Sequence, residues 1–133
     1  MHPKLIEWDE TMKSMFDRVD AILEERHAGR WRLRRNRPAR GETANPEADG
    51  LFDVGVTFTP GYGSEHGRGY LLVIDLATHD KVDPRERETI EHEVLELLDQ
   101  FLPEFFPGRD LEVVRDGSSY KLLGDFSLGK VQD

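Results

Sequence analysis

The sequence predicts an α+β domain in which two helices pack on one face of an antiparallel sheet. Two segments repeat apolar residues at spacings of three and four, which is the period of an amphipathic helix. Four shorter segments alternate or concentrate apolar residues as strands do, and turn residues group them into two hairpins. The resulting order, α-β-β-α-β-β, is typical of folds whose helices cover one side of a sheet.

The first helix is predicted over residues 3–27. Pro3 suits a first turn, and Gly29 suits a C-terminal stop. The apolar stripe of this helix consists of Leu5, Trp8, Met12, Met15, Phe16, Val19, Ile22 and Leu23. Such a stripe can pack against the sheet of the same chain or against a partner helix.

Residues 51–60 and 70–77 predict an antiparallel hairpin. The first run alternates, which predicts one buried face and one open face. Its apolar positions on the buried face are Phe52, Val54, Val56 and Phe58. The second run is apolar on both faces for most of its length, which indicates an interior strand.

The second helix follows the first hairpin. Asp83 is a suitable N-cap, Pro84 suits the first helical position, and Glu86 completes a capping box. Its inward stripe is Ile90, Val94, Leu97, Leu98 and Phe101, and Pro103 is expected to end it. Residues 111–115 and 120–126 then predict a second hairpin across the turn from Asp116 to Ser119.

The whole chain, residues 1–133, is expected to form a single domain with an exposed basic and loop segment at 30–50. The alternation of RWRLRR permits an extra edge strand near Trp31, whereas the proline and glycine content from Asn36 to Gly50 predicts an exposed loop. The α-β-β-α-β part of the element order also occurs in KH-like RNA-binding and ribosome-associated domains. The likeness is one of element order, because the GXXG loop between two helices is missing.

Composition narrows the functional classes. The chain has no cysteine, so disulfides, thiolate catalysis and cysteine metal sites are excluded. We expect no membrane association, because no apolar run approaches the eighteen or so residues of a membrane helix. The first ten residues, MHPKLIEWDE, place acids where a secretory signal has its apolar region, so a cytoplasmic location is expected.

The charge distribution singles out residues 26–40, which we call the basic arm. It holds seven of the 18 lysines and arginines and no acid, whereas the formal net charge of the chain is −9. The candidate contacts for a nucleic acid or a partner are Arg30, Trp31, Arg32, Arg34, Arg35 and Arg37. Arginine pairs well with phosphate and tryptophan stacks on bases, so RNA is one partner class. The alternatives are an acidic protein partner and the acidic surface of the chain itself.

The connection GYGSEHGRG at 61–69 is the second candidate site. Its backbone N–H groups could form an anion nest, and its recognition side chains would be Tyr62, His66 and Arg68. An enzyme site near this connection is therefore one alternative. However, phosphate-binding loops usually lead from a strand into a helix, and this one joins two strands, so a hairpin tip is the favoured interpretation.

No other pattern indicates catalysis or metal binding. The histidines and carboxylates at 65–66, 79–80 and 91–93 lack metal-ligand spacing, so we expect no metal and no cofactor. No serine lies in a GxSxG motif. Asp75 in the apolar run at 70–77 either marks a site or simply faces solvent or an arginine.

The favoured function is a small interaction domain that acts by binding and not by catalysis. Leu71 and Val73 lie on the second face of the predicted sheet, which two helices on the other face leave without cover. We therefore expect a homo-oligomer or a complex with a partner protein. The alternatives are an RNA- or ribosome-associated protein that uses the basic arm, and an enzyme with a site at 61–69.

Overall fold

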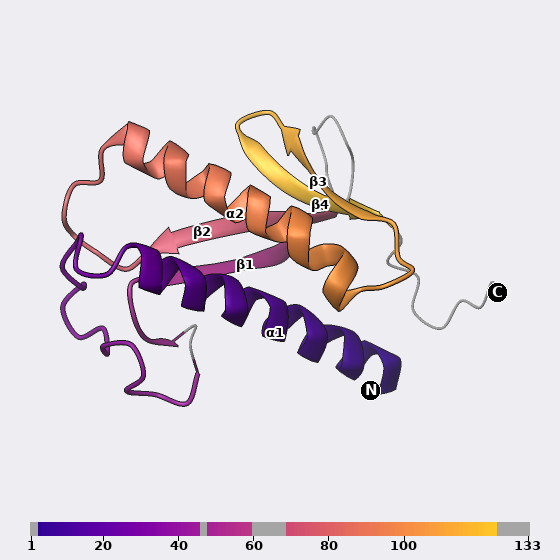
Figure 1. Ribbon diagram of the computed structural model, residues 1–133, viewed down its shortest axis with the longest axis horizontal. Helices are drawn as coiled ribbons and strands as arrows, with labels where there is room; N and C mark the ends of the chain where they lie inside the picture. The colour runs from indigo at the N-terminus through magenta and orange to yellow at the C-terminus, as the bar shows by residue number, and fades with distance from the viewer. Residues whose placement is uncertain (1–2, 46–47, 60–68, 125–133) are drawn as a thin grey trace.

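The computed structural model describes residues 3–45, 48–59 and 69–124, and side chains from residue 7 onward. It contains two helices and a four-stranded antiparallel sheet, which confirms the predicted α+β class and element order (Figure 1). The elements in chain order are α1 (Pro3–Arg26), β1 (Phe52–Thr59), β2 (Gly69–Leu76), α2 (Pro84–Phe105), β3 (Leu111–Asp116) and β4 (Ser119–Gly124).

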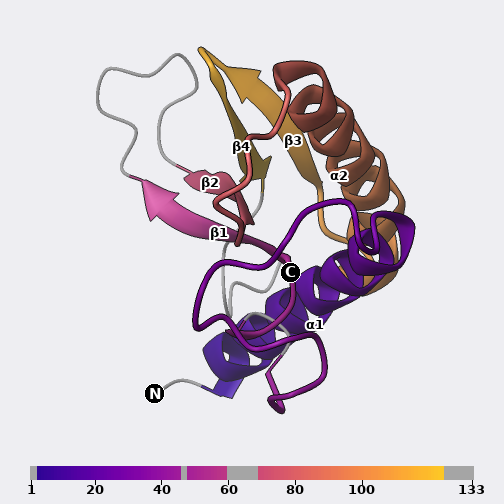
Figure 2. The same ribbon diagram turned by 90° about the vertical axis from the view of Figure 1, so that its left-hand side faces the viewer.

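The molecule has two layers, with both helices on the same side of the sheet (Figure 2). The strand order is β1-β2-β4-β3, so β1 and β3 form the two edges and β2 is interior as predicted. Between the layers lies one core, to which α1 contributes most of its predicted stripe. The buried residues of α1 are Trp8, Met12, Met15, Phe16, Val19 and Leu23, whereas the side chain of Leu5 lies outside the described part.

The N-cap predicted for α2 is confirmed, whereas its predicted C-terminal end is wrong. Asp83 is the N-cap and accepts a hydrogen bond from the backbone N–H of Arg85 at 2.8 Å. The Glu86 carboxylate instead accepts from Arg30, at 2.8 Å. The prediction that Pro103 ends the helix is wrong, because the helix continues to Phe105. Burial of Leu102 and other apolar side chains of the last turns holds this end in place despite the missing proline N–H.

The two strand hairpins form with the predicted partners. β1 and β2 pair along their whole length, from Phe52 opposite Leu76 to Thr59 opposite Gly69. β3 and β4 pair across the turn Gly117-Ser118, where Gly117 has a φ of 66°. The two hairpins join only at the start of β2, where Tyr70 and Leu71 oppose β4. The rest of β2 therefore has no strand neighbour on its β4 side within the described residues.

Two expectations for residues 30–50 need correction. The segment near Trp31 is not a strand. Its backbone N–H groups make separate hydrogen bonds and do not form a strand ladder. The N–H of Arg32 donates to the Asp80 carboxylate at 2.8 Å, and that of Arg34 donates to the Ala77 carbonyl at 2.7 Å. The loop that follows is mostly exposed as predicted, but Asp49 and Gly50 at its end are buried.

Candidate functional site

The basic arm folds back on the molecule and contacts the acidic body of the chain. It leaves the C-terminal end of α1 and lies beside the start of α2 and the end of β2 (Figure 1). At its start, Arg26 Nη1 lies 3.4 Å from Oε2 of Glu93 on α2. Further along, Arg30 Nη2 lies 2.8 Å from Oε2 of Glu86 on the same helix. The same guanidinium lies 5.1 Å from the ring centre of Trp31, so Trp31 already has a cationic partner on one face.

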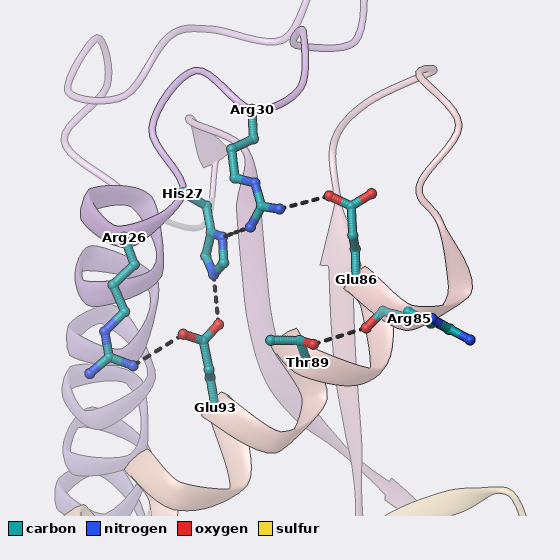
Figure 3. Close-up of polar contacts among 7 residues, drawn as sticks. All are labelled: Arg26, His27, Arg30, Arg85, Glu86, Thr89 and Glu93. Carbon is teal, nitrogen blue, oxygen red and sulfur yellow. Dashed lines mark hydrogen bonds and ion pairs between the residues drawn. The ribbon is translucent and has the colours of Figure 1, made fainter.

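His27 is the buried centre of this contact region and links α1, the arm and α2 (Figure 3). Arg30 Nη1 lies 2.8 Å from His27 Nδ1, and His27 Nε2 lies 2.6 Å from Oε1 of Glu93. A guanidinium can only donate, so Nδ1 accepts and the ring carries its proton on Nε2, which donates to Glu93. The imidazole is only 5 % exposed, so this chain of hydrogen bonds holds elements together and presents no reactive nitrogen to solvent.

Arg32 forms the most extensive ion pair of the arm. Its Nη2 lies 2.9 Å and its Nε 3.2 Å from Oδ1 of Asp80, while its backbone N–H donates to Oδ2. These hydrogen bonds from Arg32 hold the pKa of the Asp80 carboxyl below its usual range. The pair is open to water, so it orients the arm without adding much stability.

Arg34 and Arg37 are bound to backbone carbonyl groups. Arg34 Nη2 donates to the Leu76 carbonyl at 3.3 Å and lies 3.8 Å from Oδ1 of Asp75. Asp75 is half exposed and faces this arginine. Pairing with an arginine was one of the alternatives that the sequence left open for Asp75. Arg37 donates to the carbonyls of Asp49 and Gly50, each at 3.0 Å, and so closes the loop on itself.

The remaining candidate residues have different outcomes. Trp31 and Leu33 are partly buried against the core, whereas Arg35 is exposed and makes no hydrogen bond or ion pair with the described part of the chain. Tyr62, His66 and Arg68 lie outside the described residues. The arm contacts therefore show an internal function for Arg30, Arg32, Arg34 and Arg37.

A second set of polar contacts, which the sequence did not predict, joins two acids of α1 to the edge of β1. Glu24 Oε2 accepts the backbone N–H of Phe52 at 2.7 Å, and Asp20 Oδ1 accepts that of Val54 at 2.9 Å. The two acids are one helical turn apart on α1, so they reach N–H groups two residues apart on the strand. The available signal was Asp20 itself, an acid directly beside Val19 of the apolar stripe.

Asp20 is in an unusual environment for a carboxylate. It is 1 % exposed, and its Oδ2 has no hydrogen-bond partner in the described part of the chain. The pKa of Asp20 is raised to about 8, mainly by burial and to a lesser extent by the charges of Asp53, Asp17 and Glu24, against the opposing hydrogen bond from Val54. At neutral pH the group is therefore mostly protonated.

Beyond Val54 the helix no longer covers the strand edge, and a groove opens there. The groove has a volume of about 480 Å³ and lies between the N-terminal half of α1 and β1. Its lining combines the apolar residues Trp8, Met12, Phe16, Val56 and Tyr70 with the charged residues Asp9, Lys13 and Asp53. Phe58 lies on the same strand and is 58 % exposed, so the prediction that its side chain is buried is wrong. Val73 on β2 is 42 % exposed.

The described residues show no group of three or more histidines and carboxylates placed to hold a metal ion. None of the described helices is both long and apolar enough to cross a membrane.

These features define a two-layer α+β domain in which Asp20, Glu24, Arg34 and Arg87 bind backbone groups at the edges of the β1–β2 hairpin. A family model described as "Uncharacterised protein" matches residues 3–124, and the chain belongs to this family. A similar protein, named "Uncharacterized protein", comes from Borreliella burgdorferi (strain ATCC 35210 / DSM 4680 / CIP 102532 / B31). It is 42% identical over 108 residues, which cover 81% of this chain and 84% of the relative. No solved structure matches the chain.

Proposed function

We propose that the chain is an interaction domain that acts by binding and associates with a second copy of itself. The observation that carries this proposal is the exposure of Phe58 and Val73, the large apolar side chains that face solvent among the described residues. Both lie on the β1–β2 hairpin, and Phe58 follows the groove beside α1. Exposed aromatic groups beside an apolar groove are typical of interaction surfaces.

The charge pattern supports self-association at this hairpin. The chain has a formal net charge of −9, so two copies repel each other over most of their surface. Residues 54–59, VGVTFT, include no charged side chain. The hairpin is therefore a surface at which two copies can meet without placing like charges together.

The test is the mass of the purified chain in solution. Sedimentation equilibrium or light scattering at micromolar concentration should report about twice 15.3 kDa. Salt should increase the dimer fraction, because it screens repulsion between two acidic copies while leaving an apolar contact in place. A monomer at every concentration over a hundredfold range, with and without salt, would exclude the proposal.

The RNA alternative receives support from Arg35, which is exposed and uncommitted within the described part of the chain. The other four candidate arginines already have acceptors on the protein. An RNA would have to replace those acceptors with phosphates, at the cost of the arm contacts. These contacts therefore favour an interaction domain over an RNA-binding protein, and RNA binding stays a prediction.

A further inference from the structure

The edge of β1 is divided into a covered half and an open half. Because the N–H of Val54 points to Asp20 on α1, the backbone groups of Val56 and Phe58 point to the same side, away from β2. Asp20 and Glu24 accept hydrogen bonds from the first half of this edge. For Val56 and Phe58 the described residues provide no such partner. The second half of β1 thus retains donors and acceptors for another strand.

The helix provides space for such a strand. α1 and β1 diverge from the point where Asp20 meets Val54, and both views show the N-terminal end of α1 well separated from the end of β1 (Figures 1 and 2). The groove of about 480 Å³ lies in this divergence, with Trp8 and Met12 on one wall and Val56 on the other. A strand added to β1 would place alternate side chains against this apolar wall.

We propose that the added strand is β1 of a second copy, paired antiparallel with Thr57 on the two-fold axis. This inference rests on the proposed self-association and specifies its interface. Val56 of each copy then lies opposite Phe58 of the other, and each such pair exchanges two backbone hydrogen bonds. The two sheets become continuous, and the helices of both copies lie on the same face.

The edge is complementary to itself, which favours a second copy over an unrelated strand. Phe58 is exposed on its own chain, and antiparallel pairing brings it beside the partner's Val56, at the partner's groove with Trp8 and Met12. The same contact occurs twice, as a two-fold interface requires. Asp20 and Glu24 occupy the edge as far as Val54, so the free edge begins after Val54 and its register is fixed.

A symmetric disulfide tests the register, because the natural chain has no cysteine. On the axis, the two Thr57 residues form a non-hydrogen-bonded pair with Cα atoms about 4.5 Å apart, within disulfide range. Thr57→Cys should therefore give a covalent dimer under mild oxidation on a non-reducing gel. Thr59→Cys is the matched control on the same strand, because its two copies would be roughly 13 Å apart along the strand. Equal cross-linking of both variants, or none for Thr57→Cys, would overturn the proposed pairing.

A second pair of variants separates the strand edge from a general effect of added charge. Phe58→Asp should raise the dimer dissociation constant by at least about a hundredfold, because an apolar contact is lost twice. Ser118→Asp adds the same charge in the exposed turn of the β3–β4 hairpin, at the other edge of the sheet, and should change that constant by less than about threefold. Circular dichroism melts should confirm that both variants fold, which the exposure of both positions favours.

The outcomes distinguish the two proposals. A natural chain that is monomeric throughout overturns self-association and the pairing with it. A dimer that survives Phe58→Asp, or that Ser118→Asp dissociates instead, retains self-association and overturns pairing through β1. A monomer whose β1 amide signals shift on addition of an extended apolar peptide would assign the edge to a foreign strand and also overturn the second copy as the occupant.

Discussion

The two outer edges of the β1–β2 hairpin are closed by different side-chain types, carboxyl groups on one edge and guanidinium groups on the other. On β1, the N–H groups of Phe52 and Val54 donate to the carboxyl groups of Glu24 and Asp20. On β2, the carbonyls of Ile74 and Leu76 accept from Arg87 at 2.8 Å and from Arg34 at 3.3 Å. Each edge group is matched by the side-chain type that can satisfy it, since carboxylates accept and guanidinium groups donate.

The difference between the edges is their exposure to water. The acids that close the β1 edge, Asp20 and Glu24, belong to α1 and point to the strand that packs against it. Asp20 is buried there, where the dielectric is low and a charge is costly. The arginines of β2 lie at the surface, where each contact is weak but a strand cannot easily pair. The arm contributes Arg34 to this edge, whereas Arg87 belongs to α2. One arginine of the basic arm therefore covers a carbonyl group that the sheet would otherwise leave open.

The largest effect should come from the charge of Asp20. Its pKa is about 8 in the folded chain and close to 3.8 in the unfolded chain, so the folded chain binds the proton more tightly. This contribution to stability is complete below about pH 4 and is lost as the pH rises towards 8. The free energy of unfolding should fall by up to about 1.4 kcal/mol per pH unit across that window.

The variant Asp20→Asn isolates this contribution. It retains an acceptor for the Val54 N–H and cannot ionise, so urea unfolding from pH 5 to 9 should lose the decline that the natural chain shows. Asp9→Asn, an exposed acid on the same helix, should leave the decline intact. A natural chain whose stability is flat across this range, relative to Asp20→Asn, would show that the carboxyl is hydrated and not buried.

The next largest effect concerns the Glu24 contact with Phe52. Gly50 has a φ of 74°, and an added Cβ would lie 2.6 Å from Glu24 Oε2. Gly50→Ala should therefore displace the carboxylate as well as strain the backbone, at a cost of about 3 kcal/mol. Gly29→Ala is a close control, because its φ is 75° and nothing lies within 4 Å of the added Cβ. It should cost about 1–2 kcal/mol.

The difference between these two variants, measured by chemical unfolding, reports the strength of the edge contact. Equal losses for Gly50→Ala and Gly29→Ala would mean that Glu24 moves aside without cost. In that case the covered half of β1 would depend on Asp20 rather than on both acids.

The sequence predicts local features well because they depend on neighbouring residues. The stripe of α1 and the cap at Asp83 follow from spacing and from one hydrogen bond within a turn. Phe58 shows the limit of this reasoning. Alternation indicates which face of a strand points inward, but not where the covering helix diverges from it, so an exposed phenylalanine looked buried.

The contacts of the arm could not be predicted from the sequence for a related reason. Arg30 and Arg32 meet acids 56 and 48 residues further along the chain, and only the folded arrangement brings these partners together. The composition showed that basic residues cluster in the arm, but not which acids they contact. The same limit applied to Asp20, whose position beside the stripe was visible while its partner on β1 was not.

The smallest effects should come from the surface edge, where single arginines of the arm can be compared. Arg34→Ala removes a donor from the Leu76 carbonyl and should lower the free energy of unfolding by about 1 kcal/mol. Arg35→Ala removes an exposed side chain that makes no hydrogen bond or ion pair with a described residue, and it should leave stability unchanged within about 0.5 kcal/mol. Equal effects of the two substitutions would mean that the arm does not close the β2 edge.

Variants of the arm arginines also test RNA binding. If single-stranded RNA binds through the arm, the logarithm of affinity should fall with the logarithm of salt concentration at about −0.7 per phosphate contacted. Replacing Arg32, Arg34, Arg35 and Arg37 by alanine together should then flatten this slope by roughly 2.8, while Arg35→Ala flattens it by one contact. If the arm only closes the sheet, RNA should show no measurable affinity at 50 mM salt, and the fourfold variant should instead melt at a lower temperature. That result would leave the uncharged end of β1, and not the basic arm, as the surface through which this acidic domain meets its partner.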